Sequence, residues 1–211
     1  MEQALSLFGK EVRPGQKEYE IMAIVEREAR RQGVEDFRFL IARSSQPQVG
    51  LRPAGPSPIQ RGEALLVSVA ASYQRHWAEL GRTFCLGNPP EESVKSHDLA
   101  KNIFRKLVAS VKVGASVATA VEWLKEIPAA PVRDSLQAYG LGNGIGLDLT
   151  EAPLLGRENA VKIQPGMTLT LRVCLAGKEC GHGLISQPFL VTETGLQSLV
   201  QPVEEMALVK G

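Results

Sequence analysis

The pattern of apolar and charged positions near the start of the chain predicts a helix over residues 14–33. Apolar side chains recur there near helical spacing, with charged residues between them, at Tyr19, Met22, Ala23, Val25 and Ala29. Pro14 suits the first turn of a helix, and Gly33 suits the residue that ends one.

Later segments include both strand-like and helix-like patterns. Short apolar runs bounded by turn residues predict strands over residues 37–42, 64–71, 74–84, 147–149, 168–175 and 184–191. Helices are predicted over residues 91–111, 116–125 and 134–139. Residues 44–58 are rich in Ser, Pro, Gly and Gln and predict a loop. Helices and strands in separate runs indicate an α+β fold.

Composition narrows the class of protein. The chain has 211 residues, 44% of them hydrophobic and 22% charged, with a formal net charge of +1. This length fits one large domain or two small ones. The charge gives no general attraction to nucleic acid or to a membrane surface, and no apolar stretch approaches the length of a membrane span. Three cysteines argue against a disulfide framework, so we expect a cytoplasmic protein without nucleic-acid or membrane partners.

Three ordered segments resemble a known family. Residues 62–84 are similar to the pattern Gly-Asp-x-x-x-x-Asp-x-Gly-Ala followed by Asp-x-Thr-Arg-Thr-Phe. Residues 142–153 resemble Gly-His-Gly-Ile-Gly-Leu-x-x-His-Glu-x-Pro, and residues 165–195 resemble Pro-Gly-Met, Glu-Pro, Ile-Glu-Asp and Val-Thr-Glu-x-Gly. The chain thus resembles the pita-bread family of methionine aminopeptidase, Xaa-Pro aminopeptidase, prolidase and creatinase.

The resemblance implies an α+β pita-bread fold, a curved antiparallel sheet with helices on its outer face. We expect a single domain over residues 1–211. A longer parent chain stays open, because many relatives carry another domain before this one, and a homodimer stays open as well. The glycines of residues 142–146 are expected to allow a tight backbone path at the wall of the pocket.

The resemblance also implies where two divalent metal ions would be held. Relatives that hydrolyse peptides bind them with two Asp, one His and two Glu, and the ions activate a bridging water. At those positions this chain has Ser68, Glu79, Asn143, Arg172 and Ser186. Only Glu79 could supply a charged ligand, and Arg172 would repel a cation at every relevant pH. We therefore expect no metal and no cofactor, and we take these five residues as candidate ligand-binding positions.

Arg172 and Glu79 give the sharpest hypothesis about the pocket. A buried cation needs a carboxylate partner or a bound anion, so we predict that the two side chains pair. The pair is either a structural plug in a disused pocket or part of a site in which the guanidinium of Arg172 binds a carboxylate ligand. Both versions stay open at the level of the sequence.

Metal-independent catalysis is an alternative, because the creatinase branch of the family works without metal. That branch needs a His in the loop that here covers residues 52–57, and this segment contains none. The candidate catalytic groups are His76, which could face the pocket, and Glu151, which matches a family Glu. Thr150 stands at the family's substrate-His position, so Glu151 would lack an imidazole neighbour. We expect local hydrogen bonds to hold Glu151.

The other histidines and the cysteines have simpler explanations. His97 lies among charged and polar residues of a predicted helix and is expected to be exposed. His182 lies in a predicted Gly-rich turn near Cys174 and Cys180, but the spacing is not one of the usual zinc patterns and a fourth ligand is missing. Cys85 is expected to be buried in a strand.

Together these residues predict a non-hydrolytic, peptidase-like domain, a pseudoenzyme that binds a small ligand or a protein partner. The alternative is a metal-independent hydrolase or lyase of creatinase type, acting on a small amino-acid-like substrate. A third possibility is a chain that homology alone would assign to the Xaa-Pro peptidases although it lacks their metal centre. The sequence identifies neither ligand nor partner, and it leaves open whether the pocket is filled.

Overall fold

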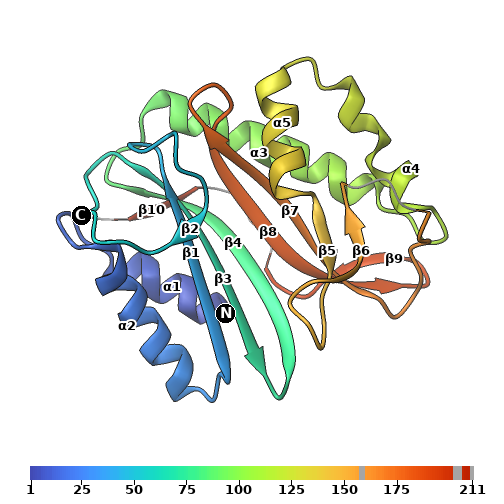
Figure 1. Ribbon diagram of the computed structural model, residues 1–211, viewed down its shortest axis with the longest axis horizontal. Coiled ribbons are helices and arrows are strands. Elements are labelled where there is room, and N and C mark those ends of the chain that lie inside the picture. Colours follow the sequence, from blue (N-terminus) through green and yellow to red (C-terminus); the bar gives the residue numbers. More distant parts are fainter. Residues whose placement is uncertain (157–159, 202–205, 210–211) are drawn as a thin grey trace.

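The computed structural model describes residues 1–156, 160–201 and 206–209, and Figure 1 shows a strongly curved sheet with helices around it. The helices are α1 (Glu2–Glu11), α2 (Glu18–Arg31), α3 (Glu91–Ser110), α4 (Val117–Val121), the 3-10 helix η1 (Glu122–Glu126) and α5 (Ala130–Tyr139). The strands are β1 (Asp36–Arg43), β2 (Arg52–Pro53), β3 (Ala64–Tyr73), β4 (His76–Leu86), β5 (Gly142–Gly144), β6 (Glu151–Leu155), β7 (Thr168–Gly177), β8 (Gly181–Thr192), β9 (Gly195–Ser198) and β10 (Ala207–Val209).

The strands form one sheet in the order β2-β1-β3-β4-β8-β7-β5-β6, with β9 paired to β8 and β10 to β4. The pairings are antiparallel except that of β10 with β4. In Figure 1 the first half of the chain forms β1 to β4 and the second half forms β5 to β9, and the halves meet where β4 lies beside β8. The predicted α+β architecture is confirmed.

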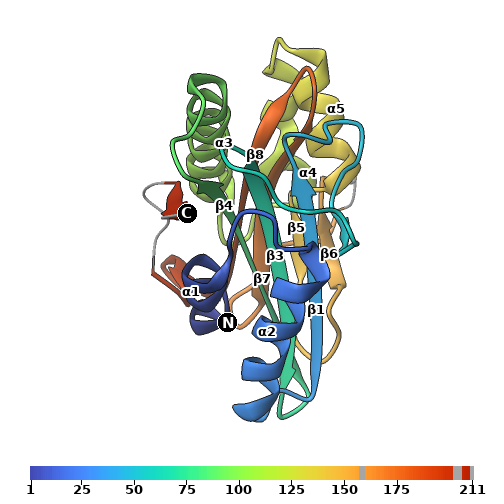
Figure 2. The ribbon, with the colours of Figure 1, turned by 90° about the vertical axis from the view of Figure 1, so that its left-hand side faces the viewer.

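Helices cover the outer face of the first half of the sheet. α1 and α2 pack against β1, β3 and β4 around the fully buried side chains of Phe8, Ile21 and Leu80. Figure 2 shows α1 and α3 along the same side of the strands. Within the described part of the chain, no helix is both long and apolar enough to cross a membrane.

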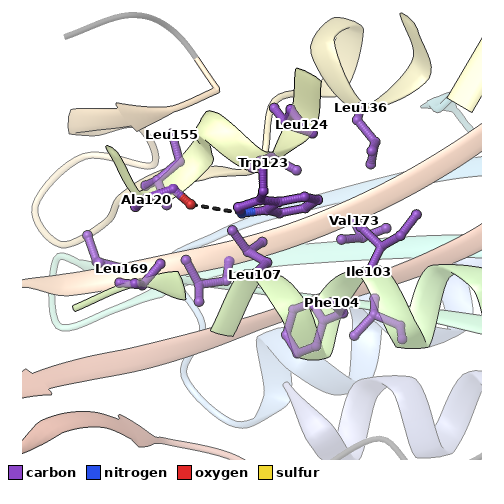
Figure 3. Packing of buried hydrophobic residues seen from close by; sticks show 14 of the residues in the cluster. Ile103, Phe104, Leu107, Ala120, Trp123, Leu124, Leu136, Leu155, Leu169 and Val173 are labelled. Atoms are coloured by element: carbon purple, nitrogen blue, oxygen red, sulfur yellow. Dashed lines mark hydrogen bonds between the residues drawn. The ribbon is translucent and has the colours of Figure 1, made fainter. Parts of the chain in front are cut away.

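The second half has its own core between β7, β8 and the helices α3 to α5. The Trp123 ring lies at its centre, close to Leu107 and Leu155 (Figure 3), and is 8% exposed. Its indole N–H donates to the carbonyl of Ala120 at 2.9 Å, which satisfies the polar group of the ring inside an apolar environment. This core fixes the position of β7, which carries Arg172.

The two halves of the sheet are joined at a point where a side chain would not fit. Gly81 on β4 pairs with Ser186 on β8, and a Cβ on Gly81 would lie 2.9 Å from atoms of both Ser186 and Leu184. Next to this pair, Oγ1 of Thr83 donates to the carbonyl of Leu184 at 3.1 Å and accepts its N–H at 2.8 Å. A threonine hydroxyl thus takes the place of backbone pairing at the junction.

The long segment between β1 and β3 is held by a buried group of charges. Arg43 donates to both carboxylate oxygens of Glu63, at 2.6 and 2.5 Å, and to Glu18 at 3.2 Å. Glu18 also accepts bonds from Arg52 at 2.5 and 2.8 Å and from the N–H of Gly55 at 2.7 Å. Burial opposes the ionisation of Glu18, but the hydrogen bonds from Arg52, Gly55 and Arg43 together lower its pKa.

Some predicted elements differ from the structure. Residues 147–149 do not form a strand; they lie in the loop between β5 and β6, and Leu147 is 69% exposed. The helix predicted over residues 116–125 is divided into α4 and η1. The helix predicted over residues 14–33 begins only at Glu18, because Gly15 has a φ of +81° that a helix does not allow.

Candidate functional site

The strand register places most of the candidate residues close together on the inner face of the sheet. One row crosses four neighbouring strands, from Ser68 on β3 through Gly81 on β4 and Ser186 on β8 to Arg172 on β7. Glu79 lies two residues from Gly81 along β4 and therefore points to the same face. Because Gly81 has no side chain, the space at the centre of this row is open to the carboxylate of Glu79.

The carboxylate of Glu79 is the centre of a hydrogen-bond network. Arg172 donates its Nε to Oε1 at 2.9 Å and its Nη2 to Oε2 at 2.5 Å, a bidentate contact. Oε1 also accepts from the hydroxyls of Ser186 at 3.0 Å and Ser68 at 3.4 Å. The side chains of Glu79 and Arg172 are 9% and 18% exposed. The structure contains the predicted ion pair, and Glu79 occupies the guanidinium edge that a ligand carboxylate would use.

The other bonds of Arg172 reach the second half of the fold. Nη1 donates to the carbonyl of Tyr139 at 3.2 Å, and Nη2 donates to Oδ1 of Asn143 at 3.4 Å. A guanidinium has five N–H groups, so one N–H on Nη1 has no protein partner within the described ranges. Nδ2 of Asn143 donates to the carbonyls of Gly144 at 2.7 Å and Leu149 at 3.1 Å. Asn143 thereby holds the loop after β5 against the site.

Glycines in this segment have the expected role of allowing a tight backbone path. Gly142 has a φ of +132°, and a Cβ there would lie 1.9 Å from the carbonyl oxygen of Thr170. A Cβ on Gly144 would lie 2.4 Å from the carbonyl oxygen of Ala152. No other residue type fits such close backbone contacts.

A pocket of about 310 Å³ opens beside the ion pair. Its lining combines the polar candidate residues with aliphatic side chains, namely Arg38, Leu40, Leu51, Ser68, Ala70, Glu79, Tyr139, Leu149, Thr150 and Arg172. The Glu79–Arg172 pair therefore lies at the wall of the pocket and leaves space in front of it.

Six of these lining residues were not among the sequence candidates: Arg38, Leu40, Leu51, Ala70, Tyr139 and Leu149. The sequence does contain a signal for Arg38. Side chains alternate between the two faces along β1, and Phe37 and Phe39 face the outer core, so Arg38 must face the opposite side. No local signal identifies Leu51 or Tyr139, because the fold brings them together: the N–H of Leu51 donates to the Tyr139 hydroxyl at 3.2 Å.

The weak catalytic candidates do not meet in the pocket. His76 is exposed and absent from the lining, and its Nδ1 lies 2.9 Å from the carbonyl oxygen of Gln74, contrary to the expectation that it could face the pocket. Thr150 lines the pocket and is exposed to solvent. Oε1 of Glu151 accepts the N–H of Asp148 at 2.7 Å, the local hydrogen bond that was expected.

Two histidines differ from their predicted surroundings. His97 was predicted to be exposed, which is wrong: it is 3% exposed on α3, and neither ring nitrogen has a partner in the described residues. His182 lies on β8 instead of in a turn, is 7% exposed, and has an unpaired Nε2. Burial lowers the pKa of both. The three cysteines are free and buried, Cys85 among them as expected.

The curved sheet, its outer helices and the polar pocket on its inner face define a domain of the pita-bread class. The sequence profile of metallopeptidase family M24 matches residues 1–193. The chain therefore belongs to this family.

Curated relatives agree with this assignment. The chain is 25% identical over 199 residues to the Xaa-Pro dipeptidase of Pyrococcus horikoshii, a match that covers 93% of this chain and 57% of that protein. It is 21% identical over 200 residues to the uncharacterized peptidase YqhT of Bacillus subtilis, covering 94% and 57%. The chain spans little more than half the length of these relatives.

Solved structures share the fold. The dipeptidase PepE of Mycobacterium ulcerans superposes with a TM-score of 0.86 at 19% identity, over 99% of this chain and 57% of that one. The X-Pro aminopeptidase of Thermotoga maritima gives a TM-score of 0.84 at 21% identity, over 99% and 60%. The expected pita-bread architecture is thus confirmed.

Proposed function

We propose that this domain binds a small organic ligand in the inner-face pocket without a metal ion, and that it does not hydrolyse peptides. The observation that carries the proposal is the bidentate contact between Arg172 and Glu79, at two positions where the family resemblance places metal ligands. The pocket beside this pair, about 310 Å³, is of the size that holds small molecules in proteins.

A pair of divalent cations does not fit these side chains. The described residues contain no group of three His, Cys, Asp or Glu that could hold a metal ion. Glu79, the one carboxylate among the five candidate positions, already accepts bonds from Arg172, Ser68 and Ser186. A cation bound there would lie against a guanidinium that stays protonated at every relevant pH, or would have to displace it from the pocket wall.

The creatinase-like alternative has less support. It needs a histidine in the pocket, but His76 is exposed and lies outside the lining. Glu151 is already used to bind the backbone N–H of Asp148. Among the described residues, the candidate base and acid of this alternative do not converge as proton transfer requires.

Metal content and peptidase activity test the proposal together. The protein is incubated with Mn²⁺, Co²⁺ or Zn²⁺, freed of unbound metal and analysed by mass spectrometry for metal, while hydrolysis of alanyl-proline is followed in parallel. We expect less than stoichiometric metal and no turnover above buffer. The Pyrococcus horikoshii dipeptidase, treated in the same way, serves as the positive control. Stoichiometric metal accompanied by turnover would show that the proposal is wrong.

A further inference from the structure

Arg38 is a cation beside the pocket that has no carboxylate partner among the described residues. It is exposed on β1 and lines the pocket, and the register pairs it with Ala70, which pairs in turn with Glu79. Its guanidinium carbon lies 5.6 Å from the centre of the Trp77 ring. No hydrogen bond or ion pair joins the side chain of Arg38 to the part of the chain that the structure describes. Asp36, the neighbouring acid on the same strand face, accepts a backbone N–H instead.

The charges around the pocket do not cancel. The charged side chains in its lining are Arg38, Glu79 and Arg172. Glu79 and Arg172 are bound to one another through two hydrogen bonds, at 2.9 and 2.5 Å. The positive charge of Arg38 is left over, at the wall of a cavity with room for a ligand. A ligand with one negative charge would balance it.

The remaining walls determine the rest of the ligand. Leu40, Leu51 and Leu149 contribute aliphatic surface to the pocket, which favours an apolar body over a sugar or a phosphate. Ala70 lies between Arg38 and Glu79 in one row of the strand register, and its short side chain leaves space in front of the sheet.

We propose that the ligand is a small monocarboxylate with an aliphatic body, and that Arg38 binds its carboxylate. This inference rests on the proposed function, because it concerns the same pocket. The fork of a guanidinium matches a carboxylate in a bidentate contact, and the fork of Arg172 is already taken by Glu79. The cation–π contact with Trp77 restricts the guanidinium of Arg38 before binding, so less side-chain entropy is lost when the ligand binds. The Nη1 N–H of Arg172 that has no partner among the described residues can donate to a neutral acceptor elsewhere on the ligand.

Matched acids and amides test the role of the charge. Hexanoate and N-acetyl-leucine are titrated against the protein by calorimetry, beside hexanamide and N-acetyl-leucinamide, which have nearly the same shape without the charge. A hydrogen bond to a charged group is stronger than one to a neutral group, so we expect the acids to bind at least about tenfold more tightly than the amides. In Arg38→Gln that preference should disappear, and Arg38→Lys, which keeps the charge without the fork, should be intermediate.

Arg61→Gln is the matched control, because it makes the same charge change at an exposed position in the turn before β3, at the far end of that strand from Ala70. It should bind the acids as the unchanged protein does. Equal affinity for acids and amides, or equal affinity of Arg38→Gln and Arg61→Gln for the acids, would overturn the role of Arg38 and leave ligand binding in the pocket intact. If neither acids nor amides bind, both this inference and the proposed ligand binding are wrong.

Discussion

At the scale of single residues, the carboxylate of Glu79 depends on the four donor groups around it. Two belong to Arg172, and the others are the hydroxyls of Ser68 and Ser186. The side chains of Glu79 and Arg172 are only 9% and 18% exposed, so water replaces a missing donor poorly. When one partner of a buried ion pair is removed, the folded state loses more free energy than the pair contributes, because the other charge is left buried without a partner.

A double-mutant cycle measures this dependence. We expect Arg172→Met and Glu79→Gln each to lower the free energy of unfolding by about 3 kcal/mol, since each leaves one buried group without its partner. The double variant should lose clearly less than the sum of the two, because no unpaired charge remains. Urea denaturation followed by circular dichroism gives the three values. Losses that simply add would mean that the two side chains are not energetically coupled.

The ion pair was predictable from the sequence, whereas the contacts of the residues around it were not. Motif spacing fixed the strand positions of Glu79 and Arg172, and their opposite charges suggested the pairing. The roles of Asn143 and Arg38 depend on contacts between distant segments: Asn143 binds the carbonyl of Leu149, and Arg38 lies over the ring of Trp77. Spacing along the chain does not encode such contacts.

At the scale of elements, a side chain replaces backbone pairing at the junction between β4 and β8. Oγ1 of Thr83 serves both the N–H and the carbonyl of Leu184. Thr83 is 1% exposed, so water cannot take over either bond. Buried backbone groups that lose their partners are costly.

Replacement of the hydroxyl tests the junction. Thr83→Val keeps the shape but leaves both backbone groups of Leu184 unpaired, and we expect it to lower the free energy of unfolding by roughly 1–3 kcal/mol. Thr83→Ser is the control, because it keeps the hydroxyl and removes a methyl group worth about 0.8 kcal/mol. Chemical denaturation compares the two. If the Thr83→Val variant is as stable as the Thr83→Ser variant, the two hydrogen bonds of the Thr83 hydroxyl do not stabilise the junction.

The prediction of helices and strands succeeded for the long strands. It failed where tertiary contacts determine the local backbone conformation. The strands that became β1, β3, β4, β7 and β8 were predicted within a few residues, because long apolar runs bounded by turns leave few alternatives. Residues 147–149 carry two leucines but form a loop, since the bonds of Asn143 fold the chain back there. Helix α1 was not predicted, although Ala4, Leu5 and Phe8 are buried near helical spacing within its ten residues.

At the scale of the whole molecule, the fold keeps its shape at low sequence identity. A TM-score of 0.86 accompanies 19% identity to the Mycobacterium ulcerans dipeptidase. The positions that preserve the shape here are glycines at close contacts, such as Gly81 and Gly142, and the apolar residues under the helices.

Two buried histidines make the stability of the whole fold depend on pH. Burial is the main cause that lowers the pKa of His97, with Lys101 adding to it and Asp98 opposing it. Burial also lowers the pKa of His182, against an opposing effect of Glu92. In the unfolded chain both rings titrate near the usual value of about 6.5. Above that pH neither state is charged and the histidines contribute no pH dependence. Below it the unfolded chain binds protons that the folded chain does not, so stability falls.

We therefore expect the free energy of unfolding in urea to decrease between about pH 7.5 and about pH 5.5, a window above the titration of ordinary carboxyl groups. The combined variant His97→Leu and His182→Leu should lose most of this decrease, because it removes the two rings that folding keeps neutral. His76→Leu is the matched control: His76 is exposed and bound to a backbone carbonyl, so its removal should leave the decrease unchanged. A combined variant that retains the full decrease would show that other groups cause it. A flat profile in the unchanged protein would show that protonation of the two rings does not favour the unfolded chain in this range.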